Sequence, residues 1–473
     1  MSVEKSRKKG QTSEKLMDPM ESLPEAAAQI DLWDDLAASL VKISKSHAFV
    51  PEEQLLKFVD YLERKLSSVQ YLWLDMFKGS PCPKLIDMID VPLSHIPVSV
   101  YDTSVEWLDK FSIGLLCAFV VWSLNRLLTI LEPPQQGGHQ RRTTSKFHVA
   151  VFVALAMVLR NEPNTLVIVL PTLKEDEYQG HDKLPILVWM MAQVHVIFFN
   201  STVKCGQASQ GDLSVGLYSW SCNLLPVFYQ ENLLPVSRSN SQSMDLILQL
   251  AEMILSNLDA RTILVNGTVI DKQRLISPYA FELLMRLTFP ASSERVKATE
   301  RFEAIYPLLK EVALACEPGS ELMKQVTQQI FHYSLIIAGR RNLVLAKEAT
   351  AIAVWSLTEN VDCCKQWEKL YWENKEASVA VLKKLVDERG DISIKLASSP
   401  SHKFTLNQTM ESIRLKNEKA ITEGGTIGSR YKEADKSCKV MSGRFFPENA
   451  CLKGTAIITA VVLAAVAVLA SNL

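Results

Sequence analysis

A helical spacing of apolar residues recurs along the interior of this 473-residue chain. Between Glu52 and Ser67 the large apolar side chains fall at i, i+3, i+4, i+7 and i+11, which places them on one helix face: Leu55, Phe58, Val59, Leu62 and Leu66. Pro51 stands at the start of this run, where its missing N–H costs nothing. The spacing therefore predicts an amphipathic helix that packs on a core through that face.

Later stretches have the same character: Glu294–Ala315, Leu322–Ala338, Leu343–Leu357 and Ala377–Val386. Within the first of them, one face is expected to carry Val296, Phe302, Ile305, Leu308, Leu309 and Val312. Pro307 is expected to kink this helix. Pro318–Gly319 and Gly339 separate the helices, and Val361–Cys364 is expected to lie in a short join.

Short joins between helices favour antiparallel neighbours, and a run of such pairs without strand blocks indicates an α-solenoid of the HEAT or armadillo kind. No strict sequence period is present, so such repeats would be degenerate. Glycine (18) and proline (20) are also sparse for a β-rich fold. We predict an all-α fold with a helical-repeat body, and a compact multi-helix bundle is the structural alternative.

Changes in composition divide the chain into regions. We expect a disordered polar leader over 1–29, an N-terminal helical region over 30–132, a flexible Pro- and Gly-rich loop over 133–145, a helical-repeat region over 146–420, a tether over 421–454 and a transmembrane anchor over 455–470. The leader is basic and is not followed by an apolar stretch, so no signal peptide is expected.

The segment Thr455–Ala470 contains no charged residue and no polar stripe. As a helix it would span about 24 Å, a little less than the ~30 Å hydrocarbon core of an average bilayer. Such a length suits a thin membrane such as that of the endoplasmic reticulum, with the Golgi as the alternative. Basic residues precede the segment (Lys436, Lys439, Arg444 and Lys453), which predicts that the body faces the cytosol. We expect Thr455 to Ala470 to bind the lipid bilayer as a tail anchor.

Two other apolar stretches are shorter. Phe111–Leu131 is interrupted by Asn125 and Arg126, and Val149–Leu159 is briefer still. Both fit buried core helices better than membrane spans. Contact of Phe111–Leu131 with the membrane is left open as an alternative.

The sequence contains none of the motifs that signal a phosphate-binding loop, a zinc protease, a nucleophile elbow or a dinucleotide fold. The nine cysteines are scattered without a C-x-x-C spacing, which is typical of reduced, buried thiols in a cytosolic body. Net charge is −1, which gives no reason to expect nucleic acid. We predict no catalytic, cofactor-binding or metal-binding residue, no small-molecule substrate and no enzyme activity. His95 could be a ligand or base, but a histidine in a loop or cap is the commoner case.

Two features could contact a protein partner of unknown identity. The mixed-charge run Glu294–Glu303 is either a partner surface or a solvated helix face with i,i+4 pairs. Trp367, Tyr371 and Trp372 cluster at helical spacing, which is more often core packing than an interface anchor.

Several blocks resemble the transmembrane protein 214 family, particularly its plant branch: Asp90–Pro97, Lys183–Pro185 with Val188–Gln193, Leu287–Ser293 and Ala304–Lys310. The resemblance implies an endoplasmic-reticulum membrane protein with a helical cytosolic region. Animal members are implicated in apoptosis under endoplasmic-reticulum stress, because they bring a procaspase to the membrane. Plants lack true caspases, so for a plant-like member only the scaffold function would carry over. The family offers no catalytic residue to transfer.

Val194–Gln207 departs from the family pattern, and we hypothesise a non-native insert there, from a retained intron or a gene-model error. The leading functional hypothesis is a membrane-anchored helical scaffold that recruits cytosolic proteins to the endoplasmic reticulum. Its alternatives are a trafficking or tethering factor of the secretory pathway and a membrane-attached enzyme with an unrecognised site.

Overall fold

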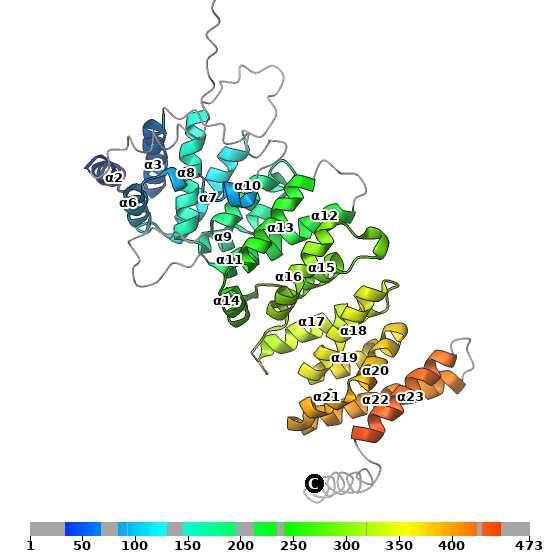
Figure 1. Ribbon diagram of the computed structural model, residues 1–473. Helices are drawn as coiled ribbons and strands as arrows, with labels where there is room; N and C mark the ends of the chain where they lie inside the picture. Colours follow the sequence, from blue (N-terminus) through cyan, green and yellow to red (C-terminus); the bar gives the residue numbers. More distant parts are fainter. Residues whose placement is uncertain are drawn as a thin grey trace, which may run out of the picture. The chain divides into compact units, whose positions relative to one another are not determined.

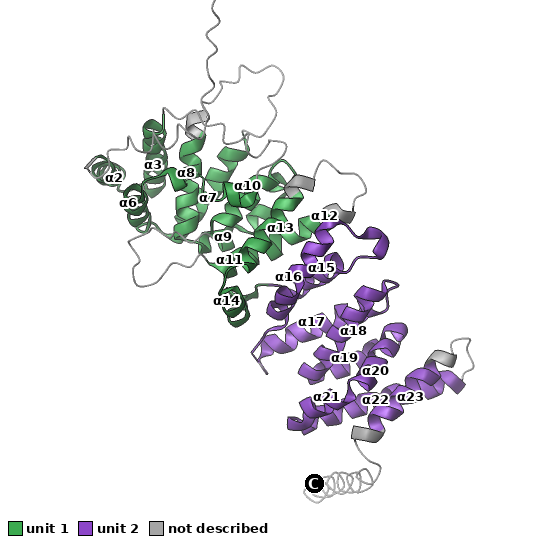
Figure 2. Ribbon diagram, in the orientation of Figure 1, with its two compact units in different colours: residues 1–275 green, residues 276–473 purple. Residues whose placement is uncertain are grey.

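The computed structural model describes residues 34–67, 84–91, 93–129, 145–194, 212–233, 241–317, 319–422 and 428–445. Helix makes up 81% of them and strand 1%, which confirms the predicted all-α class. The chain divides into two compact units, residues 1–275 and 276–473 (Figures 1 and 2). This division falls inside 146–420, which the composition predicts to be one region.

Unit 1 consists of short helices packed around α8 (Ser145–Asn161) and α10 (Leu184–Gln193). Its other elements, in chain order, are α2 (Asp34–Ser46), α3 (Pro51–Lys65), α5 (Leu85–Met88), η1 (Leu93–His95), α6 (Val98–Leu108), α7 (Ile113–Leu128), α9 (Asn164–Val169), η2 (Thr172–Lys174), η3 (Asp176–Tyr178), α11 (Leu213–Ser219), the π-helical turn η4 (Trp220–Leu224), α12 (Leu225–Leu233), α13 (Ser241–Leu255), α14 (Ala260–Asn266), β1 (Val269–Ile270) and β2 (Gln273–Arg274).

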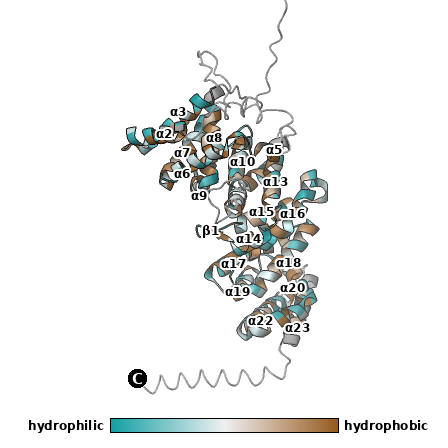
Figure 3. Cartoon of the chain, turned by 60° about the vertical axis from the view of Figure 1, so that its left-hand side comes forward, coloured by the Kyte–Doolittle hydropathy of each residue, from teal (hydrophilic) through white to brown (hydrophobic). Residues whose placement is uncertain are grey.

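The core of unit 1 lies along the apolar stretch Val149–Leu159 of α8, where each side chain is at most 1% exposed. Helices α3, α6, α7 and α10 all pack against α8. The buried face predicted for 52–67 is confirmed, because its five apolar side chains are at most 1% exposed. Figure 3 shows hydrophobic and hydrophilic residues sharing single helices, as helices with one buried face require.

A small antiparallel hairpin in unit 1 was not predicted. Strands β1 and β2 pair Val269 with Arg274 and Ile270 with Gln273. Asp271 and Lys272, between them, both have positive φ, at 44° and 62°. Two successive positive φ values are those of the tight turn that matches the twist of a two-residue hairpin, and aspartate tolerates this conformation better than most residues.

Unit 2 is built from helical pairs in two rows (Figure 1). Its elements are α15 (Pro278–Thr288), η6 (Ser292–Glu294), α16 (Lys297–Leu314), α17 (Glu321–Ala338), α18 (Leu343–Glu359), α19 (Val361–Leu370), α20 (Lys375–Asp387), α21 (Arg389–Lys395), η7 (Leu396–Ser398), α22 (Pro400–Thr422) and α23 (Gly428–Phe445). Helices α15, α17, α19 and α22 each contact the next, and so do α18, α20 and α23. The two rows meet where α17 packs on α18 and α22 on α23, and α16 packs on α15 at the start of the first row.

Two predictions for unit 2 are wrong. Val361–Cys364 is the first turn of α19 rather than a join, because the Asn360 side chain caps a helix that starts at once after α18. Residues 428–445 form helix α23 rather than part of a tether. Its buried residues Tyr431, Ala434, Cys438 and Met441 repeat at helical spacing and pack on α20 and α22.

The face predicted for 294–315 is correct in part. Phe302, Leu309 and Val312 are buried, whereas Val296 precedes the helix and is 55% exposed. Helix α16 runs through Pro307, so the kink there stays a prediction. The predictions for 1–29, for the loop up to residue 144, for 195–207 and for the anchor 455–470 lie outside the described residues. Val194 ends α10 and is buried.

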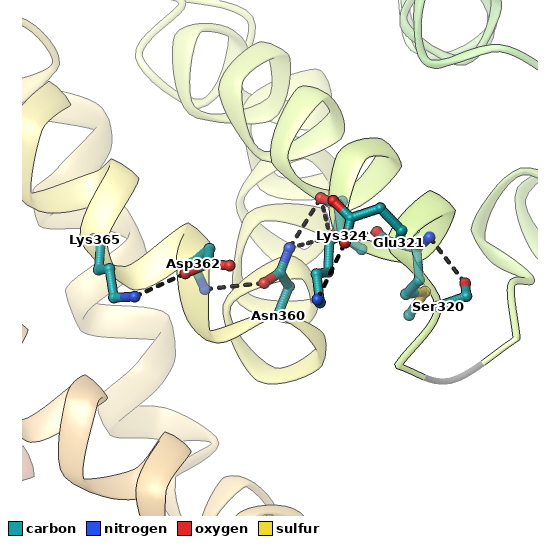
Figure 4. Close-up of polar contacts among 8 residues, drawn as sticks. Ser320, Glu321, Lys324, Asn360, Asp362 and Lys365 are labelled. Atoms are coloured by element: carbon teal, nitrogen blue, oxygen red, sulfur yellow. Dashed lines mark hydrogen bonds and ion pairs between the residues drawn. The ribbon is translucent and has the colours of Figure 1, made fainter.

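Asn360 connects three helices of unit 2, as Figure 4 shows. It ends α18 and begins α19, where its Oδ1 accepts the backbone N–H of Asp362 at 2.9 Å. Its Nδ2 donates to the Lys324 carbonyl at 2.9 Å and to Thr327 Oγ1 at 2.8 Å, both on α17. Because Asn360 is only 4% exposed, water cannot readily replace these bonds, and the side chain fixes α19 against α17.

We expect Asn360→Ala to destabilise unit 2 by about 2–3 kcal/mol, since it removes a cap and two buried hydrogen bonds to α17. Asn360→Asp keeps the capping oxygen but loses the donor to α17. The α19 amides should therefore stay protected from hydrogen exchange, while the link to α17 is lost. Hydrogen exchange of the α17 and α19 amides in the full chain separates these effects. Lys365→Ala is the matched control, because its exposed pair with Asp362 contributes about 0.5 kcal/mol at most. This role would be contradicted if the α17 and α19 amides of the Asn360→Ala chain were as well protected from exchange as those of the control.

Candidate interaction surface

Two adjacent cysteines and one histidine that could carry chemistry are withdrawn from solvent, wholly or in part. Cys363 and Cys364 are fully buried in α19, and burial raises the pKa of Cys364 to about 12 and that of Cys363 further, so both are thiols at neutral pH. His95 lies half-buried in η1, where burial lowers the pKa of its imidazole. In the described part of the chain, no group of three or more His, Cys, Asp or Glu side chains could hold a metal ion.

The mixed-charge run Glu294–Glu303 is exposed at its start and contains a well-formed ion pair between Arg295 and Glu303. Arg295 precedes α16, and its guanidinium holds both carboxylate oxygens of Glu303, at 2.6 and 3.0 Å. These hydrogen bonds lower the pKa of Glu303. The partners are eight residues apart instead of the four expected, because Arg295 reaches the second turn of the helix from outside it. Both side chains are solvated, so the pair adds little stability.

The aromatic cluster predicted at 367–372 separates into two roles. Trp367 and Tyr371 belong to the core: Trp367 Nε1 donates to Ser378 Oγ at 3.0 Å and joins α19 to α20, and Tyr371 OH donates to Asn417 Oδ1. Trp372 is 39% exposed, and its ring centroid lies 6.3 Å from that of Tyr431.

Lys375 completes this exposed site. Its Nζ lies 5.2 Å from the ring centroid of Trp372 and 5.7 Å from that of Tyr431, within the range of cation–π attraction. Trp372 and Lys375 are neighbours in sequence, but Tyr431 comes from α23, in a region predicted to be a tether. Only the helical spacing of the apolar residues in α23 could have indicated it.

Two of the blocks that carry the family resemblance meet in the core of unit 1. Arg160, from the last turn of α8, donates through Nε to Gln193 Oε1 at 2.9 Å and through Nη2 to the Ile89 carbonyl at 2.7 Å. Gln193 Nε2 donates to the same carbonyl at 3.0 Å. Asp90 lies 3.3 Å from Nη2 and offsets part of the burial that lowers the pKa of Arg160. The arrangement ties the start of the Asp90–Pro97 block to the end of α10.

The other two blocks meet in unit 2. Tyr306, on α16, packs edge to face on Phe289 with ring centroids 5.0 Å apart. Its hydroxyl donates to Glu348 Oε1 at 2.8 Å, and Lys310 Nζ lies 2.6 Å from the same oxygen. Burial, with Glu348 as the next cause, raises the pKa of Tyr306, so the hydroxyl stays a donor. In both units the blocks therefore form joints between helices.

Comparisons with known proteins add no further constraint: no family model, no curated protein and no solved structure matches this chain. Among the helices that the structure describes, none combines the length and the apolar character needed to cross a membrane. What the described residues offer is a set of helical faces with one exposed aromatic and cationic site, around Trp372.

His148, near the start of α8, should make unit 1 sensitive to acid. Burial, assisted by the charge of Arg126, lowers the pKa of its imidazole to about 4 from the ordinary 6.5. The unfolded chain therefore binds the proton more tightly, and stability is lost as pH falls below about 6.5. Between pH 7 and pH 5 we expect a loss of roughly 1–2 kcal/mol. Hydrogen exchange of the α8 amides at both pH values measures this loss of stability. His148→Gln should remove the part of the loss that comes from the imidazole. If the unfolding free energy of that variant changed with pH as it does in the unaltered chain, the imidazole would be excluded as the cause.

Substitution of the two tryptophans should separate core from surface. Trp367→Ala removes a fully buried ring and the partner of Ser378, which costs about 3–5 kcal/mol. Trp372→Ala removes a half-exposed ring with two aromatic neighbours, Tyr371 and Tyr431, and one cationic neighbour, which costs about 1 kcal/mol. Thermal unfolding of the full chain measures both, and equal losses would argue against the division of roles.

Proposed function

We propose that this chain is a membrane-anchored scaffold of the transmembrane protein 214 kind, which recruits cytosolic proteins to the endoplasmic-reticulum membrane. The observation that carries the proposal is the succession of paired helices in unit 2. Each pair contacts mainly the pairs before and after it, and this supports the proposal of an α-solenoid. Such arrays present long rows of side chains and are widely used to bind other proteins.

The row structure supports a binding role because its outward residues are not needed for the core. Along α17, the buried positions include Met323, Val326 and Ile330, while Lys324, Gln325 and Gln329 are exposed between them. Exposed positions can therefore vary with the partner while the buried face keeps the repeat folded. Proteins held side by side on one scaffold react as if at a higher concentration.

The proposed anchor follows α23 closely. Nine residues, 446–454, stand between Phe445 and Thr455. Fully extended, this stretch can span at most about 35 Å, so a bilayer that holds Thr455–Ala470 keeps unit 2 close to its surface. The modest length of the apolar segment favours a thin bilayer, which supports the endoplasmic reticulum over thicker membranes.

Insertion into microsomes after translation tests this proposal. We expect the full chain to resist alkaline extraction, and unit 1 and unit 2 to be digested by added protease. Asn266, an exposed residue at the end of α14 within Asn-Gly-Thr, should stay free of glycan, because the body faces the cytosol. An acceptor site appended after Leu473 should be glycosylated.

A matched variant, Leu463→Arg with Val466→Arg, controls for peripheral binding. Each arginine near the middle of a membrane helix costs about 2.5–3.5 kcal/mol, so the variant should be released by alkaline extraction. A glycan on Asn266 would show that the body faces the lumen, opposite to the proposed topology. Release of the unaltered chain by alkaline extraction would refute the anchor.

A further inference from the structure

The connection between α17 and α18 carries an unusual combination of side chains. Residues 339–344 read Gly-Arg-Arg-Asn-Leu-Val. Arg340 and Arg341 are exposed, and they are followed by two aliphatic side chains that are also exposed, Leu343 by 83% and Val344 by 57%. Two exposed aliphatic residues beside two arginines have no role in the core of unit 2.

This connection is held in place. Asn342 Oδ1 accepts the backbone N–H groups of Val344 and Leu345, at 3.2 and 3.3 Å, and thereby caps α18. Its Nδ2 donates to the Phe289 carbonyl at 2.7 Å, at the end of α15. Because one side chain fixes both the cap and the neighbouring pair, Leu343 and Val344 are displayed on a rigid turn.

The site around Trp372 lies next to this turn. A Cβ added to Gly339 would come 3.5 Å from the Cβ of Ala377, so the start of the α17–α18 connection packs against the first turn of α20. Lys375, two residues before Ala377, lies over the Trp372 ring. We call the combined surface the α18 rim, and its residues are Arg340, Arg341, Leu343, Val344, Trp372 and Lys375.

The charge of the α18 rim is positive. Arg340, Arg341, Lys375 and the exposed Lys347 in the second turn of α18 oppose Glu373 and Glu376, which gives a net charge of +2 from these six residues. The first turn of α18 adds the positive end of a helix dipole. A ligand for this rim must therefore bring negative charge together with apolar side chains.

We propose that the α18 rim binds a short acidic segment of a partner protein, with large apolar side chains that cover Leu343, Val344 and Trp372. Tryptophan and arginine are the residues that most often dominate protein interfaces, and both are exposed here on a rigid support. An anionic membrane would meet Glu373 and Glu376 unfavourably, whereas a peptide can place its charges between them. This inference deepens the proposed recruiting function and rests on it for the identity of the partner class.

The test uses the full chain in a non-ionic detergent and a fluorescein-labelled synthetic nonapeptide of Asp, Glu, Leu and Phe, with anisotropy as the readout. We expect saturable binding that weakens several-fold between 50 and about 300 mM NaCl, because surface charges are screened. R340E/R341E should weaken it by about tenfold or more. L343S/V344S should weaken the binding similarly, since the apolar side chains of the peptide would lose the apolar surface against which they are buried.

Matched controls come from α2 and the connection after it. K42E/K45E reverses two exposed lysines of α2, and F49S/V50S removes two exposed apolar side chains that follow it. Both should bind as the unaltered chain does, and thermal unfolding should show that all four variants are folded. A peptide in which Lys replaces Asp and Glu should not bind.

The proposal is overturned if both rim variants bind the acidic peptide as tightly as the controls do. It is also overturned if phosphatidylserine vesicles bind through Arg340 and Arg341 while the peptide does not. The peptide assay requires no membrane, so its failure leaves the anchoring proposal standing. Failed insertion into microsomes would equally leave a positive peptide result intact.

Discussion

Short helices leave many N–H and C=O groups without partners at their ends, and at several junctions of this structure side chains satisfy them. Asn342 and Asn360 each cap one helix and also bind a backbone carbonyl of another. In unit 1, Arg160 and Gln193 share the Ile89 carbonyl. These polar joints set where one helix ends against the next, a position that apolar packing alone leaves loosely defined.

The periodicity of apolar residues predicted much of the fold, because burial of one helix face leaves a local signal. The helix expected at Glu52–Ser67 and its counterpart α3 differ by two residues at most at either end. In a segment with many charged residues, the helical spacing of the few apolar residues is easily overlooked. Helix α23 is strongly polar, yet Tyr431, Ala434, Cys438 and Met441, which are buried, keep the helical spacing, and charged residues occupy exposed positions between them.

Long-range contacts were beyond the reach of the sequence. Nothing local to Trp372 indicates that Tyr431 lies against it, since the two residues meet only because α23 packs on α20. The same holds for Arg160, which reads as an ordinary charged residue at a helix end and is almost fully buried. The exposed or buried state of such side chains depends on tertiary partners, so a cluster at 367–372 could not be divided into core and surface in advance.

The direction of α23 relates the two proposed activities to each other. Its first turn brings Tyr431 to Trp372 and Lys375, beside the α18 rim. Phe445 lies 14 residues further on, which is about 21 Å along the helix axis. A chain that leaves α23 toward a membrane therefore departs from the end opposite to the α18 rim. Under the proposed anchoring, the α18 rim and the exit toward the bilayer belong to opposite ends of α23, which agrees with a protein ligand for the rim.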